Sequence, residues 1–306
     1  MRIIITGGTG LIGRALSTEL AHQGYDVVVL SRNPSRRVGI PEGVSIVGWD
    51  GQTSRGWAEH VDSATAIVNL AGESLAGKSL LAMRWTPKRK RDIIGSRVQA
   101  GSAVVDAVRN ADHKPLLVVQ ASAVGYYGPR GSERITEKDG AGKDFMAEIC
   151  VNWEASTALV ENFGVRRVVI RLGIVLSQSG GALPRQMLPF RFYGGGPIGS
   201  GQQGYPWVHI MDVCRAIRFL IETPSAEGVY NLCSPEPLTN AEFGRALAHV
   251  INRPFWLPIP ALAFKSAFGE AATVLLDGQK AYPQRLLNLG FEFQYPEVEA
   301  ALASLL

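Results

Sequence analysis

The amino-terminal segment RIIITGGTGLIG, residues 2–13, decides the fold of this chain. An apolar run, Ile3–Ile5, leads directly into a glycine-rich turn, and apolar residues then recur at helical spacing as far as Leu20. Glycine allows a tight turn and a close approach of the backbone to a phosphate, and the first turn of a helix offers unpaired N–H groups to an anion. A strand, a glycine turn and a helix in this order predict a site for the pyrophosphate of a dinucleotide.

The second predicted strand indicates which dinucleotide binds. Residues 26–30 read DVVVL, and Ser31 and Arg32 follow them. A site that selects NAD places Asp or Glu near this strand end for the ribose 2′-hydroxyl, whereas a hydroxyl and a guanidinium suit the 2′-phosphate of NADP. We therefore predict NADP(H), with Ser31 and Arg32 at the 2′-phosphate. The residues expected around the pyrophosphate are Gly7, Thr9, Gly10, Leu11, Ile12 and Gly13.

Composition limits the class of protein. The chain has 306 residues, of which 46% are hydrophobic, so it is long enough to bury a large core. Its net charge of +4 and one short basic run, residues 88–91, do not argue for nucleic acid, and no apolar run is long enough for a membrane span. The three cysteines are scattered without metal or disulfide spacing, which is typical of a reducing compartment. We expect a cytoplasmic protein with a small-molecule substrate and with no metal, nucleic-acid or membrane partner.

Strand and helix patterns alternate along the first 177 residues. The next strands are expected at 44–48, 66–70, 116–120 and 167–172, with helices at about 88–110 and 145–163. Near-continuous apolar strands that alternate with helices predict a parallel sheet covered on both faces, a Rossmann-type doubly wound α/β fold. Ligands bind such sheets at the carboxyl ends of the strands. One cleft should therefore be lined by Gly7, Ser31, Asp50, Ala71, Ser122 and Gly173.

The texture of the sequence changes after residue 177. Glycine pairs and triplets cluster between 180 and 201, and a helix near 211–223, a strand at 228–232 and a helix near 240–251 follow. We interpret 178–306 as a smaller C-terminal substrate lobe folded onto a dinucleotide domain at 1–177, with later segments completing part of the sheet. The two helices predicted at 85–109 and 145–163 are candidates for a homodimer interface.

Together these residues identify a family resemblance that covers essentially the whole chain. The chain resembles the extended short-chain dehydrogenase/reductases (SDR) of the NAD-dependent epimerase/dehydratase superfamily, and more closely their atypical epimerase-like branch of the SDR family 39U type. The motifs that carry the resemblance are TGGTGLIG (6–13), SR (31–32), NLAGE (69–73), IGSR (94–97), ASAVGYYG (121–128), NWE (152–154), RLGIVL (171–176), GGGPIGSGQ (194–202), WVHIMD (207–212) and GQK (278–280).

The resemblance implies further cofactor contacts. Asp50 is at the position where extended members often hold the adenine amino group, although the match is loose. Arg97 is placed to reach a cofactor phosphate or a substrate anion, and a salt bridge with Asp92 or another carboxylate is the alternative. The residues that should pass along the cofactor are Leu70, Ala71, Gly72 and Ala121.

The resemblance fails at the catalytic pair. Ordinary members use a Ser together with a Tyr-x-x-x-Lys helix, in which the Tyr is the general acid/base and the Lys lowers its pKa. Here the Tyr position falls on Cys150 and the Lys position on Glu154, so the standard mechanism does not carry over. Ser122 suits the role of holding the substrate oxygen, and Tyr126 or Tyr127, or else Glu154, is the candidate replacement acid/base.

The alternative for the two tyrosines is packing in the cleft wall or against the second lobe. His209 resembles a histidine that is structural at the lobe junction of extended members. Two functions remain open. The first is an NADP(H)-dependent oxidoreductase or epimerase acting on a small hydroxyl or carbonyl substrate. The second is a non-catalytic NADP(H)-binding protein that senses redox state and passes it to a partner.

Overall fold

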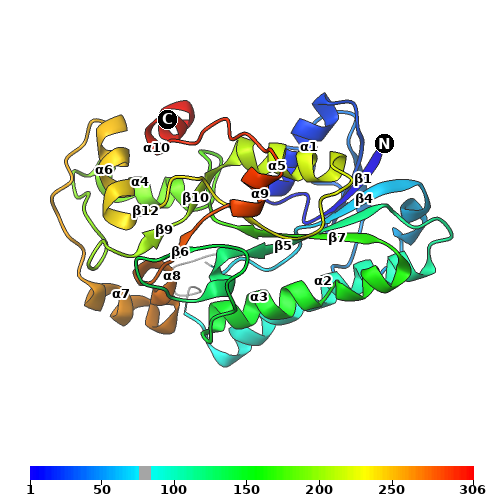
Figure 1. The fold of residues 1–306 in the computed structure, drawn as a ribbon, viewed down its shortest axis with the longest axis horizontal. Helices are drawn as coiled ribbons and strands as arrows, with labels where there is room; N and C mark the ends of the chain where they lie inside the picture. The colour runs from blue at the N-terminus through cyan, green and yellow to red at the C-terminus, as the bar shows by residue number, and fades with distance from the viewer. Residues whose placement is uncertain (76–83) are drawn as a thin grey trace.

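The centre of the molecule is a sheet of seven parallel strands (Figure 1). We describe residues 1–75 and 84–306 of a computed structural model. The spatial order is β11 (Gly228–Leu232), β7 (Arg166–Leu172), β5 (Leu117–Ala123), β4 (Ala64–Asn69), β1 (Arg2–Thr6), β2 (Asp26–Ser31) and β3 (Ser45–Gly48). The predicted Rossmann-type doubly wound fold is confirmed.

Alternation along the strands explains the two helical layers. Ile3 and Ile5 point to one face of the sheet, where they share a core with α1 (Leu11–His22) and α5 (Ile210–Glu222). Ile4 points to the other face and shares a core with α2 (Pro87–Asn110) and the 3₁₀ helix η4 (Ala158–Phe163). In Figure 1, α1 and α5 lie above the sheet, and α2 and α3 (Phe145–Ala155) lie below it.

The register brings the predicted cleft residues to one edge. Thr6 pairs with Leu30 of β2 and with Asn69 of β4, and Asn69 pairs with Gln120 of β5. Ser122 of β5 pairs in turn with Arg171 of β7. The residues that end these strands therefore follow one another along the carboxyl edge, as a parallel sheet requires.

The helix expected over 145–163 is wrong as a single element. Helix α3 begins at the N-cap Asp144 and stops at Ala155, and η4 follows it. Arg167 Nη1 donates to the Glu154 carbonyl at 3.0 Å, and Ser156 Oγ donates to the Trp153 carbonyl at 2.7 Å. Because these two groups bind carbonyls that a continuing helix would use, the helix ends there.

The smaller lobe is built around its own core, which includes Leu183, Trp207, Phe243 and Leu302. Its helices are α4 (Leu183–Arg191), α6 (Asn240–Val250), α7 (Ala261–Phe268), η5 (Gly269–Ala272), α8 (Thr273–Leu276) and α10 (Val298–Leu305). Two short strand pairs link it to residues before 178: β8 (Ile174–Leu176) with β10 (Trp207–His209), and β6 (Arg134–Ile135) with β13 (Lys280–Ala281). A third pair, β9 (Gly204–Tyr205) with β12 (Leu238–Thr239), lies within the lobe.

Two elements that follow residue 177 join the sheet domain, where later segments were expected to complete part of the sheet. β11 pairs with β7 in the central sheet, and α5 packs against α1. The helix α9 (Gln284–Asn288) packs against β11. The chain thus leaves the sheet at residue 172, returns to the sheet domain at 210–232, and then completes the lobe. Among the described residues, no helix has the length and apolar character needed to cross a bilayer.

Candidate functional site

The glycine turn is packed tightly against the end of β4. Gly7 has φ +67°, and a Cβ there would lie 2.9 Å from the Leu70 carbonyl and from the Ala71 nitrogen. A Cβ at Gly13 would lie 2.4 Å from the Cα of Gly8, so both positions exclude any larger residue. The predicted pyrophosphate residues and the 70–71 segment are thus brought together.

Helix α1 leaves its amino end open to an anion. Its N-cap, Gly10, has no side chain to cap the first turn, and that turn carries no acidic residue. The N–H groups of Leu11 and Ile12 have no carbonyl four residues back within the helix, and the positive end of the helix dipole adds to their attraction for a phosphate. This geometry fits the pyrophosphate of a dinucleotide.

A chain of buried side chains fixes the ends of β1, β4 and β5 relative to one another. Thr6 Oγ1 donates to Asn69 Oδ1 at 2.6 Å and accepts from the Ala71 N–H at 3.2 Å. Asn69 Nδ2 donates to Gln120 Oε1 at 2.8 Å, and Gln120 Nε2 donates to the Ala121 carbonyl at 2.6 Å. This set of hydrogen bonds was not predicted from the sequence, although one polar residue near the carboxyl end of each of three apolar strands was a usable signal.

The adenosine end of the site is more open. Ser31 is buried at the end of β2, and its Oγ accepts from the Asn33 N–H at 3.1 Å. Arg32 is exposed, and its guanidinium forms no hydrogen bond or ion pair with another described residue. Asp50 closes its own turn, because Oδ1 accepts from the N–H groups of Thr53 and Gln52, and these bonds lower its pKa. Arg32 is therefore available to a 2′-phosphate, and the adenine contact of Asp50 stays a prediction.

Arg97 is buried behind the segment that follows β4. Its Nη1 donates to the carbonyls of Glu73 and Ile93, both at 3.0 Å, and its guanidinium lies 4.7 Å from the centre of the Trp153 ring. A Cβ at Gly72 would touch the guanidinium carbon at 3.0 Å. Burial lowers the pKa of Arg97 to about 10. No carboxylate of the described chain pairs with Arg97, so the alternative salt bridge with Asp92 is absent there.

Ser122, Glu154 and Arg171 form the polar centre of the cleft. Ser122 Oγ donates to Glu154 Oε1 at 2.7 Å. Arg171 donates to both oxygens of the same carboxylate, from Nε at 2.8 Å and from Nη2 at 3.0 Å. Burial alone opposes the charge of Arg171, but the hydrogen bonds and the charge of Glu154 outweigh it and raise the pKa of Arg171. The carboxylate is thus held by a bidentate guanidinium while it accepts from the serine.

Cys150 occupies the other replaced position. Cys150 and Glu154 are four residues apart on α3, so they share one face of the helix, and the thiol lies beside Ser122. Burial raises the pKa of the Cys150 thiol to about 11, and the nearby Glu154 carboxylate adds to the shift. A thiol of this kind is a poor proton donor or acceptor at neutral pH.

The two tyrosines of the cleft differ in their surroundings. Tyr127 is fully buried; its hydroxyl donates to Asn231 Oδ1 at 2.7 Å and accepts from Arg171 Nη1 at 3.0 Å. Burial raises the pKa of Tyr127 to about 12, which suits a structural link between β7 and β11. Tyr126 is half-buried, and the guanidinium of Arg171 lies 3.3 Å from the centre of its ring.

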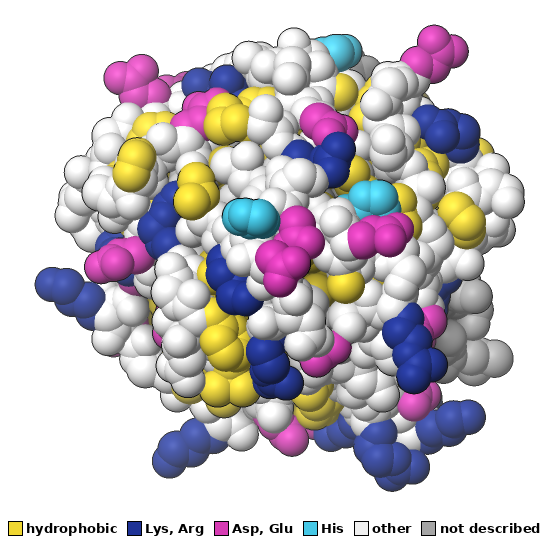
Figure 2. All heavy atoms as spheres, turned by 90° about the vertical axis from the view of Figure 1, so that its right-hand side faces the viewer, with side chains coloured by type: hydrophobic (Ala, Val, Ile, Leu, Met, Phe, Trp, Pro, Cys, Tyr) yellow, Lys and Arg dark blue, Asp and Glu magenta, His cyan; other side chains and the backbone are white. Residues whose placement is uncertain are grey.

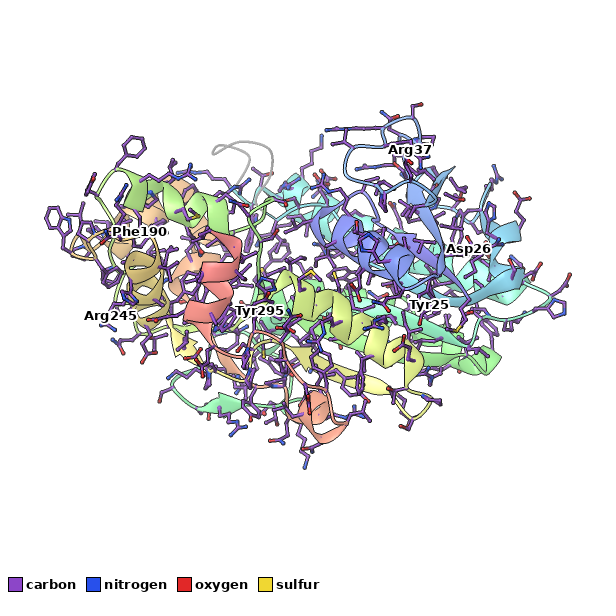
Figure 3. The ribbon with its side chains drawn as sticks, turned by 90° about the horizontal axis from the view of Figure 1, so that it is seen from above. Tyr25, Asp26, Arg37, Phe190, Arg245 and Tyr295 are labelled. Atoms are coloured by element: carbon purple, nitrogen blue, oxygen red, sulfur yellow. The ribbon has the colours of Figure 1, made fainter. Side chains whose placement is uncertain are left out.

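His209 has the structural role expected at the lobe junction. Its Nδ1 accepts from the Met211 N–H at 3.1 Å and caps α5. Its ring lies 4.0 Å from that of Tyr295, which Figure 3 labels between the two lobes, and its Nε2 lies 3.2 Å from Ser304 Oγ. Burial lowers the pKa of His209 and favours the neutral ring that this cap needs.

The glycine turn, the open end of α1 and the serine at the end of β5 define a dinucleotide-binding protein of the short-chain dehydrogenase/reductase type. Comparison with known proteins is more specific. Residues 3–233 match the NAD dependent epimerase/dehydratase family, and residues 259–305 match a domain of unknown function, DUF1731. The chain belongs to the NAD dependent epimerase/dehydratase family, and the resemblance drawn from its motifs is confirmed.

The similar proteins include relatives from a plant and a bacterium. The epimerase family protein SDR39U1 homolog, chloroplastic, of Arabidopsis thaliana is 40% identical over 100% of this chain and 87% of its own length. Epimerase family protein YfhF of Bacillus subtilis is 36% identical over 100% of this chain and 98% of its own.

Solved structures agree with this placement. Human epimerase family protein SDR39U1 (isoform 2), solved with NADPH, has a TM-score of 0.86 and 32% identity, and the match covers 100% of this chain and 99% of that one. UDP-glucose 4-epimerase of Thermus thermophilus, solved with NAD, has a TM-score of 0.76 at 19% identity over 100% of this chain and 98% of its own, which shows the shared fold alone.

Proposed function

We propose that this chain is an NADP(H)-dependent oxidoreductase or epimerase that acts on a small substrate with a hydroxyl or carbonyl group. The observation that carries the proposal is the 2.7 Å hydrogen bond from Ser122 Oγ to Glu154 Oε1. It lies at the carboxyl end of β5, at the sheet edge where ligands of this fold bind. A serine with a carboxylate behind it is an arrangement that can move a proton.

The cofactor part of the proposal rests on charge and space. The open end of α1 takes the pyrophosphate, and Arg32, which follows β2, takes the 2′-phosphate in place of the carboxylate that an NAD site would have. The human relative that was solved with NADPH supports the same choice. When bound, the nicotinamide ring supplies or accepts the hydride.

Ser122 and Glu154 handle the proton in this proposal. Because the Ser122 hydroxyl donates to Glu154, its lone pairs remain for the hydroxyl of a substrate. As the substrate hydroxyl is oxidised, its proton passes to Ser122 Oγ while the serine proton passes to Glu154. In the reverse direction Ser122 Oγ passes one proton to the carbonyl oxygen and recovers a proton from Glu154. Arg171 orients the carboxylate with two hydrogen bonds.

A second candidate is a non-catalytic protein that binds NADP(H) and reports redox state to a partner. The observation that favours it is the loss of both members of the usual pair, since Cys150 is a weak acid and Glu154 is bound by Arg171. In that case the Ser122–Glu154–Arg171 cluster only stabilises the fold.

Turnover assays on matched variants separate the two candidates. The protein is incubated with NADPH and a panel of aldehydes, ketones and keto sugars, and with NADP⁺ and the corresponding alcohols, while the nicotinamide absorbance is followed. Ser122→Ala and Glu154→Gln should each lower kcat by roughly 10²–10⁴-fold, as expected for a lost acid/base, with unchanged affinity for NADPH. Tyr126→Phe keeps the ring over Arg171 and tests the tyrosine alternative.

The outcomes are distinct. If Ser122→Ala and Glu154→Gln turn over as fast as the wild type, the proposed proton path is wrong. If Tyr126→Phe alone abolishes turnover, the tyrosine is the acid/base. If NADPH binds tightly but no compound reacts, the sensor candidate gains support. The proposal also includes a cytoplasmic location and a lobe that begins at residue 178, with later residues completing part of the sheet. The three free, buried cysteines are consistent with a reducing compartment.

A further inference from the structure

Two separate segments of this chain carry no acidic residue. No Asp or Glu occurs from residue 162 to 211, or from residue 243 to 269. Both segments contain basic residues, so each is positively charged. Over the whole chain, acidic and basic residues are nearly balanced, 27 against 31.

The fold brings parts of these two segments together at one end of the smaller lobe. The N–H groups of Trp256 and Leu257 both donate to the Gly195 carbonyl, at 2.9 and 3.0 Å, and Trp256 Nε1 donates to the Tyr193 carbonyl at 2.9 Å. Ile198 and Ile259 form a bridge between the same segments. Figure 3 marks this end of the molecule with Phe190 of α4 and Arg245 of α6.

Large apolar side chains at this end are exposed. Phe192 is 78% exposed, Trp256 64% and Tyr193 58%, and these are the aromatic residues among the large hydrophobic side chains that the described chain leaves exposed. α7 adds Leu262 at 74% and has no buried residue at all, although its sequence ALAFKSAF is mostly apolar. We call this group of exposed apolar side chains the aromatic surface. Its members are Leu188, Phe192, Tyr193, Trp256, Leu257 and Leu262.

Three basic side chains belong to the same two segments as the aromatic surface. Arg191 precedes Phe192, Lys265 lies on α7, and the guanidinium of Arg253 lies 4.8 Å from the centre of the Tyr193 ring. Of the two acidic residues that flank the second segment, Glu242 is occupied in the capping box of α6 and Glu270 pairs with Lys90. The carboxylate of Asp277 also interacts with the charge of Lys265. By contrast, acidic and basic side chains are mixed on the opposite end of the molecule (Figure 2).

We propose that the aromatic surface docks on the surface of a lipid bilayer that contains anionic phospholipids. Exposed Trp, Tyr and Phe side chains with Arg and Lys around them match the interface of such a bilayer, where the rings enter the headgroup layer and the cations meet phosphate. The proposal concerns binding to the surface of a bilayer, not spanning it, and it revises the expectation from the sequence that no membrane partner exists.

Charge argues against a second copy of this chain as the occupant. A two-fold contact would place the surface against itself. Arg191, Arg253 and Lys265 of one copy would then face the same residues of the other, without acidic partners from the two segments. Like charges brought together in this way oppose association.

Vesicle sedimentation tests the proposal. The full chain is mixed with vesicles of phosphatidylcholine alone, or of phosphatidylcholine with phosphatidylglycerol, at low and high salt. We expect binding to the anionic vesicles that weakens as salt is raised. Phe192→Ser with Trp256→Ser should weaken binding at least tenfold. Arg191→Glu with Lys265→Glu should weaken it by roughly fivefold or more for each residue, from about 1 kcal/mol for each basic residue at an anionic surface.

Matched controls come from elsewhere on the chain. Leu116→Ser replaces a leucine that is 69% exposed, and Arg109→Glu reverses an exposed charge on α2; both should bind vesicles as the wild type does. NADPH titration of every variant verifies its fold. Equal binding to neutral and anionic vesicles, absence of binding to either, or a dimer in light scattering that the Phe192→Ser/Trp256→Ser variant abolishes would each overturn the proposal.

Discussion

Replacing Arg171 by Met tests whether the buried ion pair with Glu154 holds the cleft together. The side chains of Arg171 and Glu154 are only 4% and 14% exposed, and two hydrogen bonds of 2.8 and 3.0 Å join them. Removing one partner of such a pair leaves an uncompensated buried charge, which costs about 3–5 kcal/mol. We expect both Arg171→Met and Glu154→Gln to lower the free energy of unfolding, with the arginine variant at the upper end because Tyr127 also loses a partner.

The double variant Arg171→Met/Glu154→Gln tests whether the two charges are coupled. With both charges removed, no uncompensated charge remains, so the loss should fall short of the sum of the single losses by about 2–3 kcal/mol, near the top of the range for residues in contact. Urea unfolding followed by circular dichroism measures all three variants. Arg109→Met serves as control, since its 3.7 Å pair with Asp106 is half exposed and should contribute about 0–1 kcal/mol. Strictly additive losses would refute the account of a coupled buried pair.

Three further predictions concern single residues. Arg32→Ala should remove a preference for NADPH over NADH of ~1–3 kcal/mol in fluorescence titrations, the value of a charged hydrogen bond, and an unchanged preference would place the 2′-phosphate elsewhere. Gly7→Ala should lower the free energy of unfolding by about 1–2 kcal/mol from the left-handed backbone alone. It should also weaken NADPH binding, because the new Cβ would meet the Leu70 carbonyl. Calorimetry with Gly24→Ala as control shows whether this close contact adds to the cost of the backbone conformation. Burial raises the pKa of Cys150 from 9.0 to about 11, so iodoacetamide should modify the thiol far more slowly in the folded protein than in urea. The contribution of the neutral thiol to stability should be present below pH 9 and lost as the pH rises towards 11. Rapid labelling of the folded chain would show that the thiol is accessible.

The sheet domain was predictable because most of its strands are local apolar runs, and helices follow β1 and β4 along the chain. The glycine turn, the strand end at Ser31 and Arg32, and the positions of Cys150 and Glu154 on one helix all follow from short-range pattern. The pairing of β11 with β7 does not follow from such a pattern, because the residues of a short apolar strand do not indicate which strand it pairs with.

The ion-pair partner of Glu154 could not be predicted from the sequence either. Arg171 lies within an apolar strand, seventeen residues along the chain from Glu154, and only the packing of α3 on the sheet brings the two together. The end of α3 at Ala155 depends in the same way on Arg167, a residue of the next strand. Contacts between elements decide such details, whereas the sequence pattern reports the elements themselves.

The hydrogen bonds from Thr6 through Asn69 to Gln120 fix the spacing between the two ends of the cleft. They run from the Ala71 N–H beside the glycine turn to the carbonyl of Ala121, the residue before Ser122. The distance between the phosphate end and the proton-handling end of the cleft is therefore set by three fully buried side chains that bind one another. A change at Asn69 would shift one end of the cleft relative to the other, and would be felt as misalignment of cofactor and substrate even though every group that binds them is still in place.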